Sequence, residues 1–197
     1  MVIPSSLDIE NLHKKYAPSA EALNSVLTHS YIVRDIVRQL GVNLPQIYLE
    51  LAEAGALLHD IGVYLLYKSN GEIDKPNYIT HGTLGYDLLQ RAGYVEELCR
   101  FAKFHTGVGI TKAEILEKNL PLAPMDYFAE SPEEKLVMYA DKFHSKSLPP
   151  AFNSAEHYKE LLQNFGQDKI AMFEDFINIF GNPDLEFLAK KYNQNIV

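Results

Sequence analysis

Hydrophobic residues recur at helical spacing along most of this chain. Between Ser19 and Leu40 the apolar side chains follow alternating steps of three and four residues, which places them on one face of a long helix. Gly41 stands where a helix commonly ends. His29 lies on the apolar stripe of that helix, and for a single histidine in such a place a hydrogen-bonded core residue is the commoner explanation.

The same spacing, together with capping residues, predicts further helices. Ser6 or Asp8 caps the first one, Thr80 precedes His81, and Ser131-Pro-Glu-Glu134 combines an N-cap, a proline at the first helical position and a capping-box glutamate. We expect these helices over residues 8–16, from Pro45 to His59, from His81 to Leu89, from Tyr94 to Phe104, from Thr111 for a short distance, from Ser131 to about His144, and two or three more over residues 154–190.

Two polar connections separate these segments, at residues 61–80 and 119–130. Loops of this length in a compact domain are often functional. No stretch shows the sustained alternation of a β-strand, and no change of composition marks a linker. The sequence therefore predicts an all-α protein with a single domain over residues 1–197. In the C-terminal helices Phe165, Ile170, Phe173, Phe176, Ile177 and Phe180 are expected to point inward and wrap the core.

Composition narrows the classes of function. The formal net charge is −8 and the Lys/Arg residues form no cluster larger than a pair, which argues against a long nucleic acid as partner. Cys99 is the only cysteine, so a disulfide framework or a thiolate zinc site is excluded. No apolar run reaches membrane-spanning length, and no basic segment leads into a hydrophobic run near Met1. We therefore expect a cytoplasmic protein without membrane contact, and the sequence leaves a homo-oligomer open.

One apolar segment ends in a pair of polar side chains. The run Ala54-Gly-Ala-Leu-Leu-His-Asp-Ile-Gly62 predicts a buried helix that finishes at His59 and Asp60. A buried carboxylate without a partner costs several kcal/mol, and no Lys or Arg lies between Gln46 and Tyr67. A metal ion would satisfy both side chains, although an isolated His-Asp pair is more often a polar helix end in solvent.

Other polar residues interrupt apolar faces or stand at helix ends in the same way. His81 opens a helix, His105 closes one before a glycine-rich turn, and Asp141 is set into an apolar face. If tertiary packing brings them together, the candidate metal ligands are His29, His59, Asp60, His81, His105 and Asp141. Four imidazoles and two carboxylates suit two transition-metal ions bridged by one carboxylate.

These residues resemble a known signature. The series His29…His59-Asp60…Asp141, with Leu-Leu-His-Asp-Ile-Gly and Tyr-Ala-Asp-Lys around it, is similar to that of the HD-domain superfamily of metal-dependent phosphohydrolases. The segments beginning at His81 and His105 resemble the added histidines of two-metal members. The likeness spans about residues 23–146, and small stand-alone members, including the dinucleoside-polyphosphate hydrolase branch, are the most similar.

The resemblance implies a helical bundle that hydrolyses phosphoester or phosphoanhydride bonds, mostly in nucleotides. By matching position, His29, His59, Asp60 and Asp141 would hold a first ion, and Asp60 would bridge to a second ion held by His81 and His105. No Asp-Gly-x-Gly-Tyr-Pro motif follows His105, which argues against a cyclic-dinucleotide phosphodiesterase of that type. The Glu-Asp pair of guanosine-tetraphosphate hydrolases is also missing at its expected distance.

The mechanism we expect is attack on phosphorus by a metal-activated hydroxide, with Asp60 and Lys142 as catalytic residues. Lys142 would contact a phosphate oxygen, or else it is a solvent-exposed lysine. Arg34 is a weaker candidate for substrate binding. Tyr64 and Lys68 belong to the 61–80 connection, which together with residues 119–130 is expected to form the substrate walls.

The identity of the ions and the role of the site stay open at this point. His and Asp ligands accept Fe, Mn, Co, Ni or Zn, and Mg also binds carboxylates. The expected substrate is a small nucleotide or a related phosphorylated metabolite. The alternative is a non-catalytic regulatory module that binds metal or nucleotide without turning it over.

Overall fold

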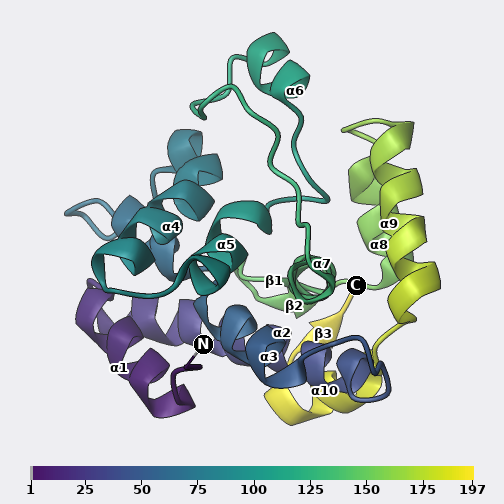
Figure 1. Ribbon diagram of the computed structural model, residues 1–197, viewed down its shortest axis with the longest axis horizontal. Coiled ribbons are helices and arrows are strands. Elements are labelled where there is room, and N and C mark those ends of the chain that lie inside the picture. The colour runs from purple at the N-terminus through teal and green to yellow at the C-terminus, as the bar shows by residue number, and fades with distance from the viewer. Residues whose placement is uncertain (1) are drawn as a thin grey trace.

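The fold is built almost entirely from helices (Figure 1). In the computed structural model, which describes residues 2–197, there are ten α-helices, two 3-10 helices and three very short strands. In chain order they are α1 (Ser6–Tyr16), α2 (Ala20–Gly41), α3 (Leu49–Leu58), η1 (Ile61–Leu66), η2 (Lys75–Thr80), α4 (His81–Arg91), α5 (Glu96–Phe104), α6 (Lys112–Glu117), α7 (Pro132–Asp141), β1 (His144–Ser145), β2 (Ala151–Phe152), α8 (Ala155–Leu162), α9 (Gln167–Phe180), α10 (Leu185–Tyr192) and β3 (Asn195–Ile196). The prediction of an all-α fold is confirmed.

Two predicted helix starts are wrong. Helix α1 is capped by Ser5, whose side chain accepts a hydrogen bond from the Asp8 N–H while the Asp8 carboxylate returns to Ser5. Helix α3 begins at Leu49 instead of Pro45. The Glu133 carboxylate of α7 accepts a hydrogen bond of 2.7 Å from the Tyr48 N–H, which ties down the residue directly before α3. This long-range contact is invisible in local sequence.

Two further local predictions need correction. The 61–80 connection is only partly irregular, because it contains η1 and η2. Ser131 does cap α7, but Glu134 does not complete a capping box: its carboxylate accepts a hydrogen bond from the Glu130 N–H and forms an ion pair with Arg100. Glu134 therefore joins α5 to α7, while the box predicted at Thr111 and Glu114 is present.

The central core is formed where α2, α3, α5 and α7 pack against one another, and α4 packs on α5 and η1. Gly62 of η1 and Gly85 of α4 permit the contact between these two helices. A Cβ atom on Gly62 would lie 2.1 Å from the His81 carbonyl oxygen and 2.3 Å from the Gly85 nitrogen, distances that no side chain tolerates. The backbone of η1 can therefore touch the first turn of α4, which brings His81 beside the end of α3.

The C-terminal helices are anchored by aromatic packing. Tyr139 of α7 and Phe143, which lies two residues after that helix, contact Phe173 of α9, with ring centroids 5.4 Å and 6.0 Å away. The Tyr139 hydroxyl donates a hydrogen bond of 2.7 Å to the Gly181 carbonyl. Phe165 does not point inward as predicted; it is 59% exposed, because it lies in the turn between α8 and α9.

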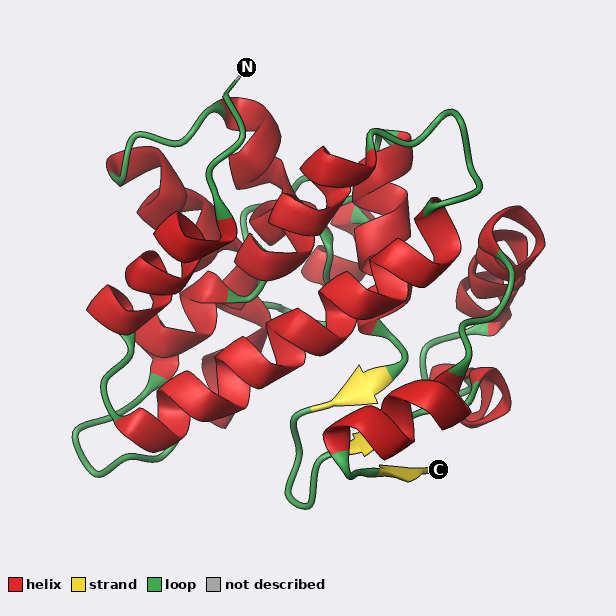
Figure 2. Cartoon of the chain, turned by 90° about the horizontal axis from the view of Figure 1, so that it is seen from below, coloured by secondary structure: helices red, strands yellow, loops and turns green. Residues whose placement is uncertain are grey.

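A small sheet, which the absence of alternation did not predict, joins the C-terminus to the end of α7 (Figure 2). Strands β1 and β2 pair antiparallel, with His144 opposite Phe152, and β2 pairs parallel with β3, with Phe152 opposite Ile196. The sheet fixes the segment that follows Asp141. Within residues 2–197, no helix is both long and apolar enough to traverse a membrane.

A buried histidine away from the polar cluster makes the fold sensitive to acid. His13 of α1 is fully buried; its Nε2–H donates to the Leu57 carbonyl and its Nδ1 accepts from the Tyr64 hydroxyl, both at 2.8 Å. Burial lowers the pKa of His13 from 6.5 to about 4. Below pH 6.5 His13 is therefore protonated in the unfolded chain but stays neutral in the folded chain. The free energy of unfolding consequently falls as the pH is lowered to about 4.

We expect His13→Gln to remove roughly 2 kcal/mol of the stability loss that the wild type suffers between pH 7 and pH 5. Urea unfolding at both pH values measures this loss, and His157→Gln is the control because His157 is only partly buried on α8. An unchanged pH dependence in the His13 variant would show that another group carries the effect.

Candidate metal centre

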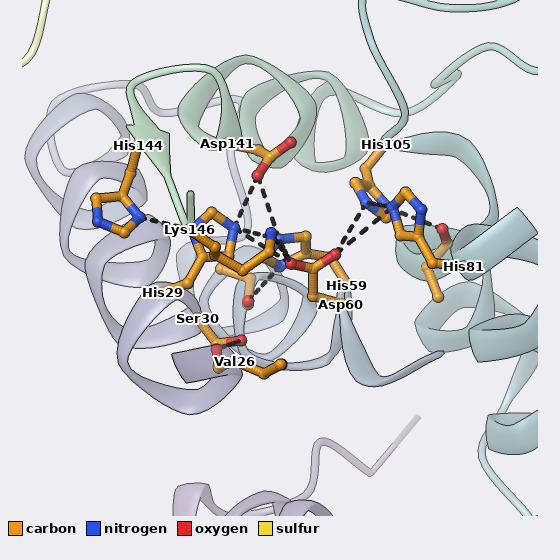
Figure 3. Close-up of polar contacts among 12 residues, drawn as sticks. Val26, His29, Ser30, His59, Asp60, His81, His105, Asp141, His144 and Lys146 are labelled. Atoms are coloured by element: carbon orange, nitrogen blue, oxygen red, sulfur yellow. Dashed lines mark hydrogen bonds and ion pairs between the residues drawn. The ribbon is translucent and has the colours of Figure 1, made fainter. Parts of the chain in front are cut away.

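Five separate segments deliver polar side chains to one point in the core (Figure 3). His29 comes from the middle of α2, His59 and Asp60 follow α3, and His81 opens α4. The other two contributors are the residue directly after α5 and the last residue of α7, His105 and Asp141. The four histidines and Asp60 are buried, and the Asp141 side chain is 15% exposed. The structure thus brings together all six residues predicted as metal ligands.

One group of ligand atoms lies on the α2 side of Asp60. The Nε2 atom of His29 is 2.9 Å from Asp141 Oδ1, 3.1 Å from His59 Nε2 and 3.4 Å from Asp60 Oδ2. The Nε2 atom of His59 is 3.4 Å from Asp141 Oδ1 and 3.6 Å from Asp60 Oδ2. Two imidazole nitrogens and two carboxylate oxygens therefore converge, a donor set that suits a divalent transition metal.

The second group lies on the other side of the same carboxylate, toward α4 and α5 (Figure 3). Asp60 Oδ1 is 3.6 Å from His81 Nε2 and 3.5 Å from His105 Nε2, and these two nitrogens are 2.9 Å apart. The two oxygens of Asp60 thus face different pairs of histidines. This is the geometry that a carboxylate bridging two ions requires.

Hydrogen bonds fix which nitrogen of each imidazole faces the centre. The Nδ1–H of His59 donates to the Ala56 carbonyl at 2.7 Å, that of His81 to the Tyr78 carbonyl at 2.7 Å, and that of His105 to the Ala102 carbonyl at 2.8 Å. In a neutral ring the proton on Nδ1 leaves a lone pair on Nε2. The nitrogens that face the centre are therefore all acceptors.

The Nε2 atom of His29 is also an acceptor, because two successive hydrogen bonds, to side chains that sequence reasoning missed, place the proton of the ring on Nδ1. Its Nδ1–H donates to His144 Nδ1 at 2.8 Å, and His144 Nε2–H donates to Gln194 Oε1 at 2.7 Å. Such outer partners orient a metal-binding histidine and set its tautomer. Gln194 is over 160 residues from His29 in the sequence, so no local pattern could have revealed it.

The arrangement fits a bound cation. Lone pairs of His81 and His105 face each other at 2.9 Å, and those of His29 and His59 at 3.1 Å. Facing lone pairs repel unless a positive charge lies between them. Burial lowers the pKa of His29 to about 3 and that of His81 to about 4, so both rings stay neutral, the form that ligates metals.

The two carboxylates are held in their charged form. Burial by itself would raise the pKa of Asp60, but the Lys146 ammonium brings it well below its ordinary value. Burial alone would also raise the pKa of Asp141, but the neighbouring Lys142 ammonium brings it well below its ordinary value. Ionised carboxylates and neutral imidazoles are the protonation states a metal site needs.

Two lysines that line a cavity next to the centre form ion pairs with the carboxylates. Lys142 is only 5% exposed; its Nζ donates to the His105 carbonyl at 2.9 Å and pairs with Asp141 Oδ2 at 2.6 Å, so the alternative of a solvent-exposed lysine is wrong. Lys146, which sequence reasoning missed, forms an ion pair with Asp60. Its signal was weak, because a lysine after a predicted helix is usually solvated.

A cavity of about 430 Å³ opens beside the centre, and Asp60, His81, His105 and Asp141 form part of its wall. Three predicted substrate-binding residues lie elsewhere. The Arg34 guanidinium pairs with Asp35 at 2.9 Å, the Tyr64 hydroxyl is bound to His13 in the core, and Lys68 extends toward Asp74 at 3.7 Å. Of the predicted wall segments, the 61–80 connection contributes Tyr78 and Ile79, and residues 119–130 contribute Leu120.

Comparison with known families agrees with this geometry. Residues 26–146 match the family model described as HD domain, which is more than half of the chain. The chain belongs to the HD domain family. HD domains bind divalent metal ions, and the matched segment contains two clusters whose ligand atoms lie within 4.8 Å of one another, His29–His59–Asp141 and His59–Asp60–His105.

Individual relatives are similar over different lengths. An uncharacterized protein of Methanocaldococcus jannaschii is 34% identical over 121 residues, which cover 59% of this chain and 64% of that protein. A tRNA (cytidine(56)-2′-O)-methyltransferase of Thermoplasma volcanium is 26% identical over 186 residues, covering 94% of this chain and 50% of the relative. The chain thus spans between half and two thirds of the length of these relatives.

The fold is similar to that of a solved HD domain. The HD domain of the L. monocytogenes phosphodiesterase PgpH, in complex with cyclic-di-AMP, superimposes with a TM-score of 0.55 at 15% identity. The match covers 96% of this chain and 99% of the other. At this identity the likeness shows a shared fold.

We expect Asp60→Ala to lose metal from both groups of ligands, and His81→Ala only from the second group, because one oxygen of Asp60 faces each group. Metal analysis of the purified variants, with circular dichroism to check helicity, measures this. Asp87→Ala is the control, since Asp87 is exposed on α4. Full metal content in Asp60→Ala would remove Asp60 from the centre.

We expect His144→Leu to weaken metal binding by roughly 10- to 100-fold, because the His29 Nδ1–H then loses its acceptor. Titration calorimetry with Mn²⁺ measures the affinity. His157→Leu, which changes a histidine on α8, should leave it unaltered. Equal affinities in wild type and His144→Leu would show that His29 needs no partner at Nδ1.

Proposed function

We propose that this protein is a divalent-metal-dependent phosphohydrolase acting on a small nucleotide or a related phosphorylated metabolite. The observation that carries the proposal is the position of Asp60, whose two oxygens face two pairs of unprotonated imidazole nitrogens at the wall of a cavity. A carboxylate shared in this way supports a two-ion hydrolytic site better than a single structural ion.

The residues divide between two ions as follows. His29, His59, Asp60 and Asp141 would hold one, and Asp60, His81 and His105 would hold the other. When bound, such ions lower the pKa of water to supply a nucleophile and neutralise charge on the phosphoryl oxygens. Fe, Mn, Co, Ni and Zn are all compatible with these ligands.

The lysines of the cavity wall would bind the phosphoryl group. Lys142 and Lys146 both line the cavity, and each is already held against a carboxylate. The His105 carbonyl fixes the Lys142 ammonium through a bond of 2.9 Å, so little side-chain freedom is lost on binding. Together with two divalent ions, Lys142 and Lys146 would give this part of the cavity wall a net positive charge, which favours an anionic substrate.

The nature of the substrate is supported by charge and by one neighbour. A net charge of −8 without a basic cluster disfavours long nucleic acids. The PgpH HD domain binds cyclic-di-AMP, a small nucleotide. Methyl transfer is not proposed, because the methyltransferase match spans only half of that relative and the family shown is the HD domain.

We expect Asp60→Asn to lower metal-dependent hydrolysis by roughly 10³-fold or more, because one charge that holds both ions is lost while the side chain keeps its shape. Release of product from a panel of nucleotides and phosphoesters, tested with each candidate metal, measures the effect. Asp87→Asn on the exposed face of α4 is the control.

The regulatory alternative gives a different result in the same preparation. A sensor would show a ligand-dependent rise in melting temperature with no turnover in the wild type. Stabilisation by a nucleotide that is never hydrolysed with any of the metals would reject the enzyme and favour the sensor.

A further inference from the structure

The cavity beside the metal centre has two chemically different parts. Its floor carries the charged and imidazole groups already described, Asp60, His81, His105, Asp141, Lys142 and Lys146. Farther from the centre the wall is mostly apolar, with Ile79, Val108, Ile110, Leu120, Leu162 and Phe165. One wall comes from the turn after α5 and from α6, and the opposite wall comes from α8 and α9 (Figure 1).

A third lysine of the wall, Lys169, is not free to bind phosphate. Lys169 of α9 is 4% exposed; its Nζ donates to the Gly109 carbonyl at 2.8 Å and pairs with Glu114 Oε2 at 2.7 Å. Glu114 also caps α6 by accepting from the Thr111 N–H at 2.8 Å. The charge of Lys169 is therefore already neutralised, and its bonds join the two walls of the cavity.

Lys118 is the other cation that lines the cavity among residues 2–197, and it is exposed at the end of α6. Its Nζ lies 5.7 Å from the centre of the Phe165 ring. Between this exposed lysine and the floor, the wall offers apolar side chains. A chain of several phosphates running outward would have to lie against that apolar surface without compensating charges, which is unfavourable.

The volume gives a second limit. About 430 Å³ lies toward the lower end of the roughly 300–1,000 Å³ found for cavities that hold drug-sized ligands. A single compact organic group fills such a space.

Phe165 supplies a surface for a flat group. It is 59% exposed although it lines the cavity, and it lies in the turn between α8 and α9 just before Gly166, whose φ is +124°. An exposed aromatic ring beside a ligand cavity offers a face on which a planar group can stack. Lys118 above the ring would add a cation to such a stack.

We propose that the substrate is a phosphomonoester with one phosphoryl group and one planar ring system, as in a nucleoside 5′-monophosphate, where the ribose links the two, and that Phe165 binds the planar ring system. This inference rests on the proposed hydrolase function. The bond between phosphorus and the ester oxygen breaks, a bond from phosphorus to a water oxygen forms, and a proton from that water passes to the ester oxygen. The products are an alcohol and inorganic phosphate.

The test compares Phe165→Ala with Phe187→Ala. Phe187 is the matched control, because it is 58% exposed and lies on α10, outside the cavity wall. In wild type, kcat/KM for a nucleoside 5′-monophosphate should exceed that for the triphosphate, for a cyclic dinucleotide and for glycerol phosphate. Phe165→Ala should reduce the KM advantage of the monophosphate over glycerol phosphate by about 5- to 10-fold, as expected for loss of one base–aromatic stack. Phe187→Ala should retain it.

Binding of a non-hydrolysable phosphonate analogue of the monophosphate, measured by calorimetry on the metal-loaded protein, gives a readout independent of turnover. Its affinity should fall in Phe165→Ala and stay constant in Phe187→Ala. A preference for triphosphates or cyclic dinucleotides would overturn the substrate assignment and leave the hydrolase proposal standing. Equal effects of the two alanine variants would overturn the role of Phe165. If no compound is hydrolysed, the hydrolase proposal fails, and phosphonate binding that depends on Phe165 would still support the planar subsite.

Discussion

The structure depends on how the charge of Asp60 is accommodated. This carboxylate is 1% exposed and lies among four imidazoles, and a charge so deeply buried is costly unless cations compensate it. Lys146 compensates one oxygen, and the other oxygen faces the lone pairs of His81 and His105, where we propose that a metal ion supplies the positive charge. These partners come from separate segments. The burial of Asp60 is therefore tolerated only when α2, α4, α5 and α7 pack around α3 in the way that brings the partners to it.

The histidines around Asp60 are themselves held in place by hydrogen bonds to groups farther from the centre. The imidazoles are oriented by backbone carbonyls of the preceding helical turns, so the helix geometry itself sets three of the four tautomers. His29 lies mid-helix on α2 and instead donates to His144 on β1. The short sheet therefore has a purpose beyond closing the C-terminus: it positions β1, and Gln194 next to β3 completes the chain of hydrogen bonds.

The sequence predicted the helical class and the convergence of six polar residues, because buried helix faces and helix ends leave periodic signals that a single chain displays. It failed where the deciding contact is distant. A helix start at Pro45 is reasonable from local sequence, but the Tyr48 N–H donates a hydrogen bond to the distant Glu133 carboxylate just before the observed start. Likewise, Lys146 and Gln194 meet their partners only through tertiary packing. Arg34, Tyr64 and Lys68 had suitable chemistry, but Asp35, His13 and Asp74 are nearer partners than the cavity.

The cavity draws its two walls from different parts of the chain. The HD match ends at residue 146, whereas Tyr158, Leu162, Phe165 and Lys169 belong to the helical hairpin α8–α9, which aromatic rings attach to α7. In the proposed hydrolase the metal ligands thus belong to the matched segment, whereas Phe165, the residue that we propose to stack on the planar group, belongs to the hairpin on the other side of the cavity. The sequence of the hairpin can therefore vary without any change to the residues that form the candidate metal centre.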